Sequence, residues 1–177
     1  MEEIEIERTF LVKTLPADLQ DHPHKVLFDI YLPSESRHPN LRLRQKGDSY
    51  EMTKKLFIDE NDHSEQKELT IPLTKEEFDE LATIKGKRVK KLRYYYPYKG
   101  ITAEIDVFQD DLAGLVVADF EFTSTQEKNA FTIPDWCLVD VTHEEFIAGG
   151  MLCGKSYVDI EEELEKINYN KILDKPE

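Results

Sequence analysis

Apolar and polar residues alternate along most of this chain, which is the pattern of β-strands that bury one face. The alternation is strict in the first twelve residues, where Glu3, Glu5, Glu7 and Thr9 share one face and mostly apolar residues occupy the other. Segments of the same kind recur to the middle of the chain. We predict eight strands, at residues 1–12, 25–32, 41–46, 49–57, 66–71, 88–97, 101–108 and 116–122.

Signals for helices are fewer and shorter. Thr74 followed by Glu77 has the spacing of a capping box and predicts a helix over 74–84. We expect a small helix at 143–148, ended by the glycine pair that follows it, and an amphipathic helix at 156–172 whose apolar stripe includes Val158. Other segments are predicted as a helical turn at 15–20, loops at 33–40 and 58–65, and a hairpin turn at 47–48.

The order of elements indicates hairpins, so we predict an antiparallel sheet in a single α+β domain over residues 1–177. Several strands carry charged residues at i and i+2 on one face, while the opposite face is apolar. In an open sheet such charged faces would lie in solvent. If the apolar faces instead pack against helices and loops outside, the charged faces line the inside of a closed barrel. We therefore expect a barrel with a polar, charged interior.

The inward candidates divide by the sign of their charge. The carboxylates are Glu5, Glu7, Glu104, Asp106, Asp119 and Glu121, and the cations are Arg42, Arg44, Lys55, Lys91 and Arg93. Carboxylates suit a hard divalent cation, and arginine and lysine suit phosphate oxygens. Cross-strand salt bridges alone are the alternative interpretation. The desolvation cost of burying so many charges favours a site for a metal-bound polyphosphate.

The composition of the chain limits the classes of ligand that it can bind. A formal net charge of −14 and a pI near 4.8 argue against nucleic-acid polymers and anionic membranes as ligands. The chain opens without a basic, then apolar, leader and contains no long apolar run, so we expect a cytoplasmic protein. Cys137 and Cys153 are too few for a disulfide framework and have no metal-ligand spacing. A homodimer stays an open alternative.

Four ordered segments carry a family resemblance. They are EIERTF at 5–10, LRLRQKGD with the TKK that follows it at 41–55, KLRY at 91–94 and AEIDVFQDDLAGLVVADFEF at 103–122. Together they resemble the CYTH superfamily, the triphosphate tunnel metalloenzymes. PDW at 134–136 and the DVT after it are similar to the short bacterial branch of inorganic triphosphatases.

The resemblance implies an eight-stranded tunnel that binds a triphosphate with Mg²⁺ or Mn²⁺ and hydrolyses a phosphoanhydride bond. It implies that Glu5, Glu7 and Glu121 are catalytic residues that bind the metal. It implies further ligands, or residues that orient water, at Glu104, Asp106 and Asp119. It implies phosphate-binding residues at Arg42, Arg44, Lys55, Lys91 and Arg93. Glu68 falls on a strand that is acidic in the family, but neutral residues flank it here.

Thr9 departs from the family signature, which has lysine at this position. A hydroxyl cannot supply the positive charge of that ammonium. Lys13 is in phase with it, but at about 3.3 Å per residue it lies about 13 Å farther along the strand. We expect hydrolysis of inorganic tripolyphosphate. Thiamine triphosphatase activity, a class IV-type adenylate cyclase and a non-catalytic polyphosphate- or nucleotide-binding module are the alternatives.

Overall fold

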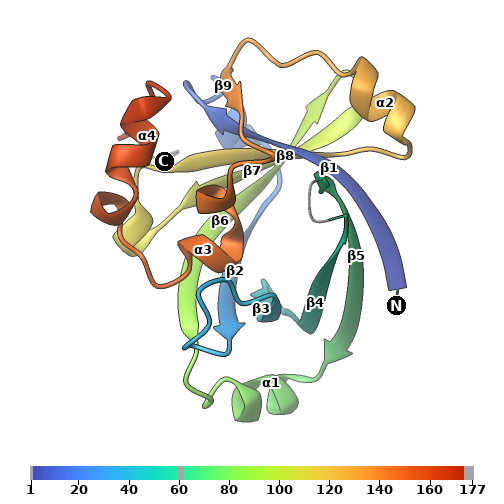
Figure 1. Cartoon of the computed structure of the whole chain (residues 1–177), viewed down its shortest axis with the longest axis vertical. Coiled ribbons are helices and arrows are strands. Elements are labelled where there is room, and N and C mark those ends of the chain that lie inside the picture. Colours follow the sequence, from blue (N-terminus) through green and yellow to red (C-terminus); the bar gives the residue numbers. More distant parts are fainter. Residues whose placement is uncertain (1, 60–61, 174–177) are drawn as a thin grey trace.

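The strands close into a barrel in the computed structural model, which describes residues 2–59 and 62–173 (Figure 1). Neighbouring strands pair antiparallel in the order β5-β4-β3-β2-β6-β7-β8-β1, and β1 pairs with β5 to complete the ring. The bounds are β1 (Glu2–Val12), β2 (His24–Leu32), β3 (Leu41–Lys46), β4 (Ser49–Asp59), β5 (Asp62–Leu73), β6 (Lys87–Tyr98), β7 (Ile101–Phe108) and β8 (Val116–Glu121). The predicted closed eight-stranded antiparallel barrel is confirmed. A short strand, β9 (Cys137–Asp140), is added beside the end of β1.

Strand β1 closes the ring because its two halves have different partners. Its first half pairs with β5, with Glu5 opposite Gln66. Its second half pairs with β8, with Thr9 opposite Asp119. The inner face of β1 therefore lies between the inner faces of β5 and β8.

The hairpins agree with the predicted turns, except that the β4–β5 arm is longer than expected. Gly47 has φ +60°, a left-handed conformation that glycine adopts without steric cost, and it joins β3 to β4. The loop predicted at 58–65 was mostly wrong, because β4 continues to Asp59 and β5 starts at Asp62, and residues 60–61 lie outside the described residues. The polar composition of this segment suggested a loop, but strand pairing satisfies its backbone groups.

Helices and 3₁₀ turns lie on the outside of the barrel and at one of its ends. They are α1 (Lys75–Leu81), α2 (Thr125–Ala130), α3 (Gly149–Leu152) and α4 (Glu161–Lys166), with 3₁₀ turns η1 (Leu19–Asp21), η2 (Asp110–Leu112), η3 (Glu145–Ile147) and η4 (Tyr157–Asp159). The capping box of α1 is confirmed, since the Thr74 side chain accepts from the Glu77 amide and the Glu77 side chain accepts from the Thr74 amide. No helix among the described residues is long and apolar enough to span a membrane.

The C-terminal third differs from prediction. The helix expected at 156–172 is limited to η4 and α4, and Val158 is 75% exposed instead of lying on a buried stripe. The chain leaves the helix because Tyr169 turns inward, where its hydroxyl accepts from the Val116 amide at 2.8 Å. Only η3 forms within 143–148, and the glycine pair begins α3 instead of ending a helix. A Cβ on Gly149 would lie 2.2 Å from the Tyr31 hydroxyl, so a larger residue here would displace the Tyr31 side chain.

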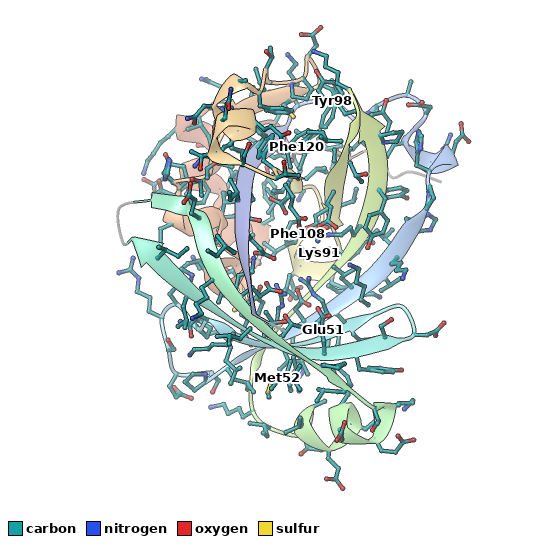
Figure 2. All side chains as sticks on the ribbon, turned by 90° about the vertical axis from the view of Figure 1, so that its right-hand side faces the viewer. Glu51, Met52, Lys91, Tyr98, Phe108 and Phe120 are labelled. Atoms are coloured by element: carbon teal, nitrogen blue, oxygen red, sulfur yellow. The ribbon has the colours of Figure 1, made fainter. Side chains whose placement is uncertain are left out.

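Apolar side chains gather in three clusters around the barrel. One, which includes Phe120 and Tyr98, packs on the outer face of β1 and β6 to β8 near α2 (Figure 2). A second lies between β2 to β4 and α1, and Figure 2 shows Met52 directed toward that helix while its neighbour Glu51 lies on the other side of β4. The outer face of β1 and β5 is barer, with Ile4 61% and Ile71 54% exposed.

The third cluster fills one end of the barrel. Leu11, Phe108 and Val117 lie on the inner faces of their strands, and they pack with apolar residues of η3, α3 and α4. The C-terminal segment therefore closes this end. The rest of the interior is polar.

Candidate active site

A cavity of about 360 Å³ occupies the polar part of the barrel interior. Every site residue predicted from the sequence lines it: Glu5, Glu7, Arg42, Arg44, Lys55, Lys91, Arg93, Glu104, Asp106, Asp119 and Glu121. The strands bring them together because side chains at i and i+2 share a face. Lys55, and not the adjacent Lys54, lies on the inner face of β4.

Lys55 is the cation at the carboxylate-rich part of the cavity. Its ammonium donates to Glu5 and lies 3.6 Å from Glu68 and 4.0 Å from Glu7. Burial, with a smaller contribution from the nearby carboxylates of Asp119, Glu5 and Glu121 and against the opposing effect of Lys55, raises the pKa of Glu7 to about 7. These carboxylates therefore repel one another and favour an additional cation.

Arg93 and Lys91 hold the carboxylates of β7. The Arg93 guanidinium donates to both oxygens of Asp106, at 2.7 and 2.6 Å, and also to Glu104. The Lys91 ammonium donates to the same Asp106 and lies beside the ring of Phe108 (Figure 2). Burial alone would raise the pKa of Asp106, but the charges of Arg93 and Lys91 hold it at about 2. Cross-strand ion pairs, the alternative interpretation, thus exist inside the predicted cavity.

The arginines of β3 differ in their surroundings. Arg44 makes a two-pronged contact with Asp29, with both hydrogen bonds at 2.7 Å. Arg42 has no ion pair within the described chain, and its buried Nε has no hydrogen-bond partner there. An unsatisfied buried donor is costly, so Arg42 is suited to bind an anion that enters the cavity.

Thr9 lies where the family signature has lysine, and it lines the cavity. Its hydroxyl donates to Asp119 at 2.8 Å, and its amide donates to the Thr142 hydroxyl at 3.1 Å. Lys13 is exposed and is not among the cavity residues, so it does not replace the missing ammonium. Burial raises the pKa of Asp119, and the neighbouring charge of Asp106 adds to this effect.

Sequence reasoning missed several residues of the cavity. Asp29 is the only charge in an otherwise apolar stretch of β2, so it had no i+2 partner to mark a polar face. Tyr31 follows it on the same face and lines the cavity. The segment 141–150 supplies Thr142 and Glu144. No periodic signal marks that segment, because tertiary packing alone brings it to the barrel.

The donor set fits a hard divalent cation in its chemistry, because carboxylate oxygens are the ligands that such ions prefer. Burial is the main cause of the raised pKa of Glu7, and a bound cation would relieve both the cost of a buried negative charge and the added repulsion from Asp119, Glu5 and Glu121. No three His, Cys, Asp or Glu side chains of residues 2–59 and 62–173 are already grouped as a metal site. Glu5, Glu7 and Glu121 are carboxylates of this region that could hold a metal, and the Lys55 ammonium now donates to Glu5.

Comparisons with known proteins agree with this arrangement. A family model described as the CYTH domain matches residues 3–131. An inorganic triphosphatase from Nitrosomonas europaea is 38% identical over 144 residues, which are 80% of this chain and 91% of that protein. An inorganic triphosphatase from Acetivibrio thermocellus is 32% identical over 74 residues, 42% of this chain and 46% of that protein.

Solved structures share the fold. The crystal structure of the inorganic triphosphatase NE1496 matches with a TM-score of 0.62 and 32% identity, over 85% of this chain and 95% of that one. A putative adenylate cyclase from Bacillus halodurans matches with a TM-score of 0.54 over 98% of this chain and 95% of that one, and its 15% identity supports a shared fold alone. From the family model and the identity to the Nitrosomonas protein, this chain belongs to the CYTH domain family.

Proposed function

We propose that this protein hydrolyses inorganic tripolyphosphate inside the barrel with the help of Mg²⁺ or Mn²⁺. The observation that carries the proposal is a cavity inside the barrel that is lined by both a carboxylate set and a basic set. The inorganic triphosphatase from Nitrosomonas europaea, 38% identical over 80% of this chain, supports the choice of substrate. The net charge of −14 supports a small anion that enters a local basic pocket over a polyanion bound at the surface.

The basic residues bind the phosphate chain in this proposal. Arg42 supplies a guanidinium with an unsatisfied Nε, and Arg44 and Arg93 supply guanidinium groups held in place by carboxylates. Arginine forks match phosphate oxygens in pairs, and Lys55 and Lys91 act as point charges. Because ion pairs already fix most of these groups, little reorganisation is needed when substrate enters.

The carboxylates hold the metal and the attacking water. Glu5, Glu7 and Glu121 are the metal ligands in this proposal, because mutual repulsion leaves this group in need of a cation. Glu104, Asp106 and Asp119 act as further ligands or orient water; the first two are held by Arg93, which favours the orienting role. A bound divalent ion would neutralise the phosphate chain and supply an activated water for in-line attack on a terminal phosphorus.

The contact between Thr9 and Asp119 favours a second candidate, a polyphosphate-binding module without turnover. The hydroxyl of Thr9 carries no positive charge to stabilise the transition state. We rank hydrolysis first because the remaining charged residues of both sets line the cavity.

Phosphate release from tripolyphosphate, thiamine triphosphate and ATP, each with Mg²⁺ or Mn²⁺, tests the proposal. We expect metal-dependent turnover that is fastest with tripolyphosphate and is lost in Glu7→Gln and Arg44→Ala. Formation of cyclic AMP from ATP would instead support a cyclase. Tight metal-dependent binding of tripolyphosphate without phosphate release would support the binding module.

A further inference from the structure

Asp29 is a buried carboxylate to which the proposed reaction gives no role. It lies on β2, directly opposite Arg44 of β3, and only 1% of it is exposed. Nε of Arg44 donates to Oδ1 of Asp29 and Nη2 donates to Oδ2, both at 2.7 Å. This two-pronged geometry fixes the plane of the guanidinium as well as its position.

The contact determines which edge of Arg44 is available to a ligand. Asp29 takes the edge formed by Nε and Nη2. The third nitrogen, Nη1, has no hydrogen bond to the described residues, and Arg44 lines the cavity. An anion that binds Arg44 therefore meets Nη1 in one fixed orientation.

Asp29 also offsets the charge of the basic set. Burial alone would raise its pKa, but Arg44, and after it Arg42 and Lys91, hold the pKa well below its usual range. It is therefore a carboxylate anion at neutral pH, close to three cations of the cavity. Its negative charge weakens the attraction of that group for any phosphate.

We propose that Asp29 is a positioning residue, which orients Arg44 toward substrate and limits how tightly the basic set holds the phosphate products. The inference rests on the proposed hydrolysis of tripolyphosphate. It assigns Asp29 no contact with the reacting atoms. Its effect reaches the substrate through Arg44 and through its charge.

Asp29→Asn tests both parts, because it keeps the shape of the side chain and removes its charge. A unit charge about 10 Å from a phosphate corresponds to roughly a tenfold change in binding at an effective dielectric constant of about 20. We expect the Kd of pyrophosphate, measured by calorimetry without divalent metal, to fall by roughly this factor. We expect kcat and KM for tripolyphosphate both to fall, since Arg44 is less well oriented and product leaves more slowly. A purely structural role would lower the active fraction and leave Kd and KM unchanged.

Three comparisons isolate the role of Asp29. Asp79→Asn makes the same substitution on the exposed side of α1 and should leave all three constants unchanged. Asp29→Glu keeps the charge but displaces the carboxylate, so it should lower kcat without tightening pyrophosphate. Asp29→Glu still tests whether Asp29 orients Arg44 if Asp29→Asn does not fold. In an Arg44→Lys background, which keeps the positive charge but has no fork for Asp29 to orient, Asp29→Asn should lower kcat by less than about twofold.

A pyrophosphate Kd in Asp29→Asn within twofold of the wild-type value would overturn the inference, and so would a wild-type kcat in Asp29→Glu. Failure of the proposed function gives a different result. In that case the wild-type protein releases no phosphate from tripolyphosphate, and the calorimetric comparison of Asp29→Asn with the wild type still decides the electrostatic role of Asp29.

Discussion

Replacing Glu7 with glutamine should change how the stability of the metal-free protein depends on pH. Glu7 is 18% exposed in its side chain, and burial with three nearby carboxylates raises its pKa from 4.5 to about 7. The folded protein thus holds this proton more tightly than the unfolded chain. The stability that the proton contributes is fully present below pH 4.5 and is lost as the pH rises through about 7.

The size of the effect follows from the two pKa values. One pKa unit corresponds to about 1.36 kcal/mol, so linkage gives a loss of about 2.5 kcal/mol in the free energy of unfolding between about pH 5 and about pH 8. Glu7→Gln is neutral throughout this range and should avoid that loss. The variant should therefore gain about 2.5 kcal/mol relative to the wild-type protein at the higher pH.

Urea unfolding with a chelator present, at both pH values, measures this difference. Glu80→Gln, on the exposed side of α1, controls for the loss of a carboxylate. Parallel pH dependence in the wild type and Glu7→Gln would refute the idea that burial and the neighbouring carboxylates raise the pKa of Glu7. It would also remove the electrostatic reason for a cation at Glu5, Glu7 and Glu121.

Three further changes have expected outcomes. Arg42→Ala should raise the KM for tripolyphosphate at least about tenfold. The urea midpoint should change little, because the substitution breaks no ion pair within the described chain. An unchanged KM would count against a role of Arg42 in binding phosphate. Thr9→Lys should raise kcat at least about tenfold in a phosphate-release assay, since it adds an ammonium beside Asp119; no gain would mean that another group supplies this charge. Phe120→Ala should cost about 3–5 kcal/mol in urea unfolding, because Phe120 is fully buried against Trp136, and the KM should stay at the wild-type value.

The strands and the faces they present could be predicted because their periodicity is local. Glu104 and Asp106 alternate with apolar residues, so any strand over them places both carboxylates on one side. The closed barrel could also be predicted, because so many charged strand faces could not all be buried in an open sheet. The C-terminal third could not be predicted in the same way, because Tyr169 and Gly149 take their positions from tertiary contacts with Val116 and Tyr31.

Site residues could be predicted where charges recur at i and i+2 along a strand. Site residues that are single charges in an apolar segment were missed. Arg42 and Arg44 mark the inner face of β3, and both line the cavity. Asp29, which holds Arg44, is the only charge in the apolar stretch 26–32 of β2 and has no charged residue at i±2 to mark a polar face. The ion pairs themselves depend on register between strands, which the sequence of one strand does not contain. The arrangement of partners inside the barrel therefore required the structure.

The most direct test of the barrel interior as the active site compares two adjacent lysines. Lys55 points into the cavity and donates to Glu5, whereas Lys54 is not among the cavity residues. The measurement is the initial rate of phosphate release from tripolyphosphate with Mn²⁺ for Lys55→Met and Lys54→Met, with folding checked by circular dichroism. We predict a loss of at least about a hundredfold for Lys55→Met, the size of one preorganised charge at a transition state, and a near wild-type rate for Lys54→Met. Equal rates in two folded variants would contradict catalysis inside the barrel.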